Sequence, residues 1–185
     1  MPAWSVRLIE ELDATGRRAN DLARGLSLEQ LNWKPTENLW SVGQCLQHLH
    51  ATNEVYLPAI SKALDGRQSS PVQEIAPGWF GRWFIRTYIE PSPRGKRARA
   101  PRKIAPQPQV DPGVLDVFLR SNDVARDQVR RAAAYNVNRI RFQNPFIPLL
   151  RFTVGTGLEI VSTHQRRHLL QAERIKQTAA FPQNG

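Results

Sequence analysis

The chain has one cysteine, Cys45, among its 185 residues. A single cysteine excludes a disulfide within the chain and a zinc site built from several thiolates. Low cysteine use is typical of a reducing compartment, and Arg7, Glu10 and Glu11 interrupt the stretch where a secretory leader would be apolar. We therefore expect a cytoplasmic protein, and any metal it binds must have ligands other than sulfur.

Long apolar runs are also missing from the sequence. No uninterrupted hydrophobic stretch approaches the roughly 18 residues that a membrane-spanning helix needs, so we expect no membrane insertion. Hydrophobic residues nevertheless make up 41% of the chain, which is ordinary for a globular protein. A length of 185 residues fits one folded unit, and we predict a single domain over residues 1–185.

Acidic residues are absent from residues 94–103, and this segment holds much of the chain's excess positive charge. The segment carries six basic residues, against a net charge of +10 for the whole chain: Arg94, Lys96, Arg97, Arg99, Arg102 and Lys103. A basic surface attracts polyanions, so nucleic acid is a candidate partner. Because the excess is confined to a proline-interrupted tract, we favour a solvated loop over a nucleic-acid-binding element.

Apolar residues recur every three or four positions in four segments, which predicts four amphipathic helices. These helices cover about residues 4–24, 42–64, 112–134 and 153–179. Ser41 followed by Gln44 forms a capping box that should start the second helix. Asp111 is expected to cap the third helix, with Pro112 at its first helical position. Pro58 lies inside the second helix and should kink it.

The connection between the second and third helices is long and rich in proline and arginine. It forms an irregular insertion over about residues 66–110, without a sustained hydrophobic period. The exception is residues 79–89, where five aromatic side chains cluster: Trp79, Phe80, Trp83, Phe84 and Tyr88. Such a cluster normally packs on something, so we expect a short helix or strand against the bundle. A substrate mouth and a dimer surface are the alternatives for this cluster.

All four histidines fall within two of the predicted helices. Residues four apart on a helix share a face, so His164 and His168 can direct two imidazoles at one ion. His48 lies one turn after Cys45 on the inner face of the second helix, whereas His50 is rotated by about 200° and should lie at the surface or rim. From spacing alone, hydrogen-bonded core histidines or chance placement explain the pattern better than a metal site does.

Two separated motifs resemble those of the DinB-like, YfiT-like four-helix-bundle family. The stretch LWSVGQCLQHL at residues 39–49 is similar to the Trp-Ser to His-Leu opening of that family's second helix, and LSLEQLNWKP at residues 26–35 resembles its lead-in. The stretch THQRRHLLQ at residues 163–171 resembles the signature of its fourth helix. The resemblance covers nearly the whole chain except the basic insertion, which with the extra His50 is the main departure.

The resemblance implies an all-α, up-down-down-up four-helix bundle, often a homodimer, with a three-histidine site for zinc, nickel or a similar divalent ion. His48 matches the ligand on the second helix, and His164 and His168 match the pair on the fourth helix. Characterised members of the family include thiol-dependent transferases and isomerases that use mycothiol, bacillithiol or glutathione. A low-molecular-weight thiol is therefore an implied cofactor, although fold membership alone does not define a reaction.

Three histidines on a divalent ion leave a coordination position open, which is typical of catalytic sites. We therefore expect a metal-dependent enzyme that activates a thiol or water, either an S-transferase or a hydrolase acting on a small electrophile. Gln165 occupies the position of the general base in the zincin His-Glu-x-x-His motif, which argues against a metalloprotease. Glu54 and Glu159 do not share the histidine face, so we assign no catalytic base.

Two neighbouring side chains have a structural and a functional interpretation. Cys45 is expected to be a small core residue rather than a nucleophile or fourth ligand. Trp40 is expected to pack at the start of the second helix, with a pocket wall as the alternative. Because coordinating imidazoles must be neutral and their reference pKa is near 6.5, acid below that range should remove the ion.

The alternative function is a non-catalytic, stress-related metal-binding or interaction protein. In this hypothesis the bundle and its ion are structural, and the basic insertion contacts anionic partners.

Overall fold

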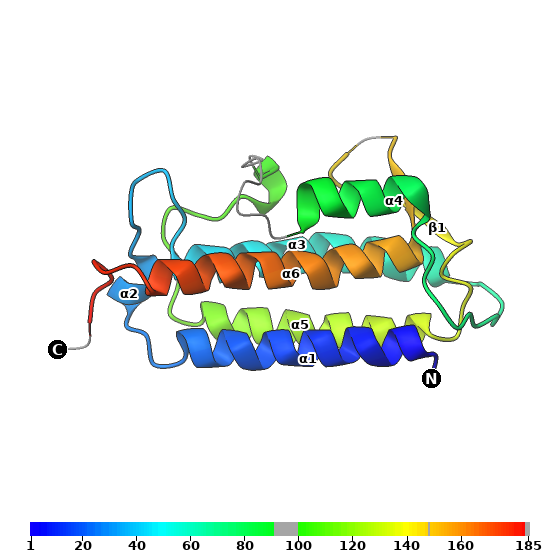
Figure 1. Cartoon of the computed structure of the whole chain (residues 1–185), viewed down its shortest axis with the longest axis horizontal. Coiled ribbons are helices and arrows are strands. Elements are labelled where there is room, and N and C mark those ends of the chain that lie inside the picture. The colour runs from blue at the N-terminus through cyan, green and yellow to red at the C-terminus, as the bar shows by residue number, and fades with distance from the viewer. Residues whose placement is uncertain (91–99, 148, 184–185) are drawn as a thin grey trace.

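The computed structural model describes residues 1–90, 100–147 and 149–183, and within them four long helices form a bundle (Figure 1). These helices are α1 (Ala3–Ala23), α3 (Val42–Leu64), α5 (Val114–Ala132) and α6 (Val154–Lys176). A short helix α2 (Leu28–Asn32) lies between α1 and α3. The predicted all-α class and the positions of the four long helices are therefore confirmed.

The bundle has the up-down-down-up topology. In Figure 1, α1 and α6 run in one direction, whereas α3 and α5 run in the other. Helix α3 packs against α5 and α6, and α1 packs against the same two helices, so α1 and α3 lie on one diagonal. Because α3 and α5 are parallel neighbours, the chain between them must travel back along the full length of the bundle. The long connection serves this purpose.

Reciprocal side-chain caps define the start of α2 and of α3, and the cap on α3 is the one that the sequence predicts. Ser41 accepts a hydrogen bond from the backbone of Gln44, and the Gln44 side chain returns one to the backbone of Ser41. Ser27 and Gln30 form the same reciprocal cap on α2. Helix α3 continues through Pro58 without a break.

The predicted start of α5 was wrong by two residues. The helix begins at Val114 after Gly113, and no side chain caps it. Asp111 instead belongs to a preceding turn, in which its carbonyl oxygen accepts from the backbone of Val114. The reason is tertiary: Val110 is buried and its N–H donates to the Asn32 side chain, so the chain is still part of the connection at this point.

The connection over residues 65–113 contains helical segments in the part that the structure describes. Helix α4 (Gly78–Phe84) continues into a π-helical turn, η1 (Ile85–Ile89), and a 3-10 turn, η2 (Arg102–Ile104), follows later. The aromatic cluster is therefore helical, the first of the two predicted forms. Its phenylalanines pack inward: Phe80 and Phe84 lie 6.0 Å and 5.0 Å, centroid to centroid, from Phe152. Trp79 lies on the surface and is 77% exposed.

A two-stranded antiparallel sheet connects α5 to α6, and no sequence pattern predicted it. Strands β1 (Arg141–Gln143) and β2 (Arg151–Thr153) are three residues each, too short for an alternating pattern to stand out. The Phe142 ring packs directly on α6 at Gly157, where a Cβ atom would lie 2.6 Å from it. Across the described residues, no helix combines the length and the hydrophobicity that crossing a membrane would require.

Candidate metal centre

Three histidines from two adjacent helices converge inside the bundle. His48 extends from α3, and His164 and His168 extend from α6. One ring nitrogen of each lies within 4.8 Å of those of the other two. Nε2 of His48 and Nε2 of His164 are 3.3 Å apart. The structure therefore brings together the three residues that the sequence singled out.

Local helix geometry and helix packing each place part of this cluster. His164 and His168 are one turn apart on α6, and their ring centroids are 4.6 Å apart. The capping box at Ser41 sets the register of α3, which packs along α6 and carries His48 to within 4.6 Å of the His168 ring centroid. His48 and His168 are buried, while His164 is partly exposed.

Hydrogen bonds orient two of the three rings. Nδ1 of His48 lies 2.7 Å from the carbonyl oxygen of Ile104, and because a carbonyl only accepts, Nδ1 is the protonated nitrogen. Nδ1 of His168 lies 3.1 Å from Oε1 of Gln171 and donates to it in the same way. In both rings Nε2 is left with a free lone pair. This is the arrangement that a metal-binding histidine needs.

Neither of these two acceptors was predicted from the sequence. Gln171 follows His168 by three residues on the same helix, so spacing alone could have suggested it. Ile104 lies in η2, 56 residues from His48, and contributes only its backbone oxygen. No motif marks such a contact.

Burial keeps the three imidazoles neutral. Desolvation lowers the pKa of His48, although the bond to Ile104 partly opposes it. Desolvation also lowers the pKa of His164 well below its usual value, with further contributions from the other two histidines and Arg167. The pKa of His168 falls to about 3, mainly through burial. Neutral imidazoles are the form that coordinates a metal ion.

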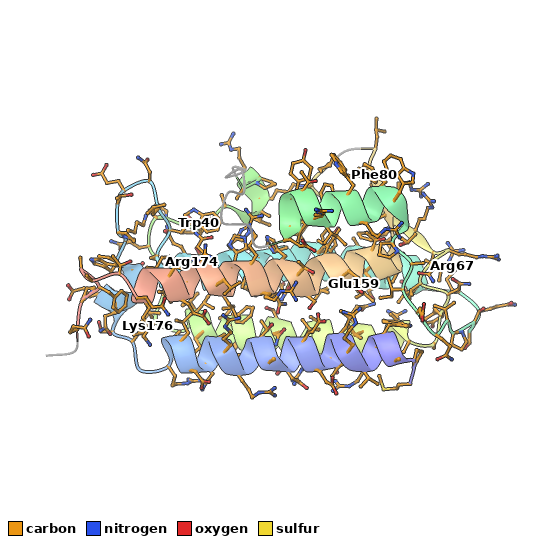
Figure 2. The ribbon with its side chains drawn as sticks, in the orientation of Figure 1. Trp40, Arg67, Phe80, Glu159, Arg174 and Lys176 are labelled. Carbon is orange, nitrogen blue, oxygen red and sulfur yellow. The ribbon has the colours of Figure 1, made fainter. Side chains whose placement is uncertain are left out.

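Trp40 forms one wall of the cluster. Its ring stacks on His168 at a centroid distance of 5.4 Å and lies 4.8 Å from that of His48. Figure 2 shows Trp40 above α6, on the side of the bundle that also carries Phe80. The indole therefore packs at the start of α3, as expected, and also contacts two of the candidate ligands.

Two other candidate ligands on α3 lie outside the cluster. Cys45 is fully buried among apolar residues, and burial raises the pKa of its thiol, so it is neither a ready nucleophile nor a member of the ligand group. His50 is partly buried and does not join the other histidines. Both observations agree with the face assignment made from helical spacing.

Carboxylates are directed away from the histidines. Glu159 forms an ion pair with Arg7 of α1, and Figure 2 shows it on the lower side of α6, towards α1. Glu54 is exposed. Gln165 is buried and its side-chain nitrogen contacts Oδ1 of Asn53 at 3.5 Å, so the position of the zincin base holds a core amide.

The structure describes only part of the basic tract. Arg102 and Lys103 are exposed, as expected for a solvated segment. The expectation for Arg94, Lys96, Arg97 and Arg99 lies outside the described residues. Ile104, directly after the tract, is buried and contacts His48, so the end of this connection is part of the site.

The donor set fits a divalent metal ion. Three neutral imidazoles converge, and hydrogen bonds fix the tautomer of His48 and of His168 with Nε2 free. The fold and the cluster together define a four-helix-bundle protein with a candidate three-histidine metal site on two adjacent helices.

Comparison with known proteins agrees with this class. Residues 11–172 match the family model of the DinB superfamily, and the chain belongs to that superfamily. The chain is also similar to Uncharacterized protein YuaE of Bacillus subtilis (strain 168). The two are 26% identical over 156 residues, which cover 83% of this chain and 88% of that protein.

Proposed function

We propose that this DinB-superfamily protein is a metal-dependent enzyme in which His48, His164 and His168 hold one divalent ion, zinc or nickel. The observation that carries the proposal is the convergence of three neutral imidazoles, with Nε2 of His48 and Nε2 of His164 only 3.3 Å apart. Two lone pairs at that distance repel each other unless a neutral His164 carries its ring proton on Nε2 and donates it to His48, or a cation lies between them. Burial lowers the pKa of both rings and so disfavours the imidazolium form, which leaves each ring with one lone pair that an ion can use.

When bound, the ion would supply a Lewis acid that lets a thiol or a water molecule ionise near neutral pH. This chemistry suits the protein because, among the residues that the structure describes, no side-chain base is placed at the cluster: Glu159 is paired with Arg7, and Gln165 cannot take up a proton. The partly exposed edge of His164 is the side from which a small molecule would reach the histidines. Trp40 excludes water from the face of His168.

The reaction that we propose is thiol transfer to a small electrophile. The thiol sulfur forms a bond to the electrophilic carbon, the bond from that carbon to its leaving group breaks, and the leaving group departs with the electron pair. The thiol proton passes to solvent. Hydrolysis of a small ester differs only in that water replaces the thiol, so both reactions belong in the test.

The test is a measurement of metal content and turnover on the same preparation. The chain is loaded with zinc or nickel, dialysed and analysed for bound metal. It is then assayed for loss of free thiol with 1-chloro-2,4-dinitrobenzene and for hydrolysis of a p-nitrophenyl ester. We expect one ion per chain and a turnover that disappears in His164→Ala but persists in His50→Ala, since His50 lies outside the cluster.

The outcomes separate the two hypotheses for this protein. A bound ion without turnover of any thiol or ester would favour the non-catalytic metal-binding alternative. Absence of a bound ion after loading would refute the metal site itself.

A further inference from the structure

Arg167 lies at the edge of the histidine face of α6. It precedes His168 by one residue and follows His164 by three, which rotates it by about 60° from His164 around the helix. Its side chain is partly buried and donates from Nη1 to the carbonyl oxygen of Tyr88 at 2.6 Å. Tyr88 belongs to the π-helical turn η1, which packs against α6. Short π-helical segments are often found at functional sites.

The charge of Arg167 has no carboxylate partner in the part of the chain that the structure describes. Ion pairs there engage other arginines, such as Arg7 with Glu159 and Arg18 with Glu173, but none includes Arg167. Residues 91–99 contain no aspartate or glutamate that could add one. Burial accordingly lowers the pKa of this guanidinium. Within the described residues, Arg167 is therefore a partly desolvated cation without a carboxylate partner.

This cation lies beside the candidate metal centre. It adjoins His168 in the chain and is about 60° from His164 around the same helix. Capping the Tyr88 carbonyl does not require a charge, because a neutral amide would donate the same hydrogen bond without the cost of burying an ion. A divalent ion on the histidines would increase the local positive charge further. The site as a whole therefore favours an anionic ligand.

We propose that Arg167 is a specificity-determining residue that binds a carboxylate carried by the thiol substrate. The inference rests on the proposed function, since it assumes that the thiol reaches the histidine cluster. A guanidinium suits this role because its N–H groups form a planar fork that matches a carboxylate, and only one of them is bound to Tyr88. The thiol would thus be held at two points, by its sulfur at the histidines and by its carboxylate at Arg167.

The test is equilibrium binding of two thiols that differ in charge. The zinc-loaded chain is titrated with 3-mercaptopropionate and with 2-mercaptoethanol by calorimetry, so that the readout does not depend on turnover. We expect the carboxylated thiol to bind roughly 10- to 100-fold more tightly, the range for a charge-assisted hydrogen bond. Arg167→Gln should remove most of this preference by weakening only 3-mercaptopropionate. Arg167→Lys, which keeps the charge but not the fork, should keep part of it.

Arg166→Gln is the matched control. This residue is the exposed neighbour of Arg167, so its loss changes the net charge equally but should leave the preference unchanged. If Arg167→Gln lost affinity for both thiols equally, or kept the preference for 3-mercaptopropionate unchanged, the inference would be overturned. Arg167 would then be only a structural contact of Tyr88. A wild-type chain that holds no zinc would instead refute the proposed function, because metal content is measured before the titration. Thermal melts of each variant show whether it is folded.

Discussion

The Nδ1 atom of His48 donates a hydrogen bond to the carbonyl oxygen of Ile104, 2.7 Å away. This bond joins a candidate ligand on α3 to the end of the long connection, just after the basic tract. It fixes the ring so that Nε2 faces His164. The connection thus contributes to the site through a backbone carbonyl.

Deleting residues 94–103 should leave cooperative thermal unfolding intact but weaken zinc binding. The tract has few apolar side chains to bury, so the bundle does not depend on it. The deletion does remove two residues of η2 and shifts the Ile104 carbonyl, and loss of such an outer acceptor costs roughly 10- to 100-fold in metal affinity. Competition with a zinc-binding dye measures this. The double variant Arg102→Gln/Lys103→Gln keeps the chain length and should bind zinc like the wild type.

Replacing each candidate ligand should abolish stoichiometric metal binding. His48→Ala, His164→Ala and His168→Ala each leave two imidazoles, too few to retain the ion through dialysis. His50→Ala should retain one ion per chain, because His50 lies outside the cluster. Elemental analysis after dialysis gives the stoichiometry. Equal loss in the His50 variant would contradict the assignment of the ligands.

Gln171→Leu should reduce zinc affinity roughly tenfold without unfolding the bundle, because it removes the acceptor that orients His168. Gln171 is only partly buried, so the leucine can be accommodated. Gln177→Leu, the same substitution at the exposed end of α6, is the control and should have no effect. If the two variants bound zinc equally well, Gln171 would have no part in orienting the ring.

The stability of the metal-free protein should fall as the pH drops below the histidine range. Folding lowers the pKa of His48 and His164 and brings that of His168 to about 3, whereas the unfolded chain keeps values near 6.5. Between these values the unfolded state binds more protons, so acid favours unfolding. The cost is at most about 1.4 kcal/mol per histidine for each pH unit. Melting temperatures from pH 8 to pH 5 measure this, and replacing all three histidines with glutamine should reduce the drop.

The same lowered pKa values change the pH at which acid should remove the ion. Reference histidine values predict loss of the ion just below pH 6.5, but protons compete with a metal only near the folded-state pKa. The difference in melting temperature between zinc-loaded and metal-free protein should therefore persist below pH 6.5 and close only as the pH approaches the folded-state values. A difference that already closes between pH 7 and pH 6 would show that the three imidazoles are not desolvated.

The sequence was sufficient for the features that depend on helix periodicity. The period of 3.6 residues per turn predicts the four long helices and places His164 and His168 on one face. The same period directs His48 inward and places His50 outside the cluster. Capping chemistry is equally local, which is why the start of α3 at Ser41 was predicted correctly. The family motifs coincide with these local features, and residues 11–172 belong to the family that they indicated.

Only the tertiary structure decided what surrounds the three histidines. Three contacts join segments that lie far apart in the sequence, where helical spacing predicts nothing. They are the bond from His48 to the Ile104 carbonyl, the stacking of Trp40 on His168 and the bond from Arg167 to Tyr88. The lowered pKa values likewise come from burial by several elements at once. A helix repeats its geometry at every turn, so its faces can be read from residue spacing. The path of a 49-residue connection depends on which contacts it finds along the bundle, and those contacts exist only once the helices have packed.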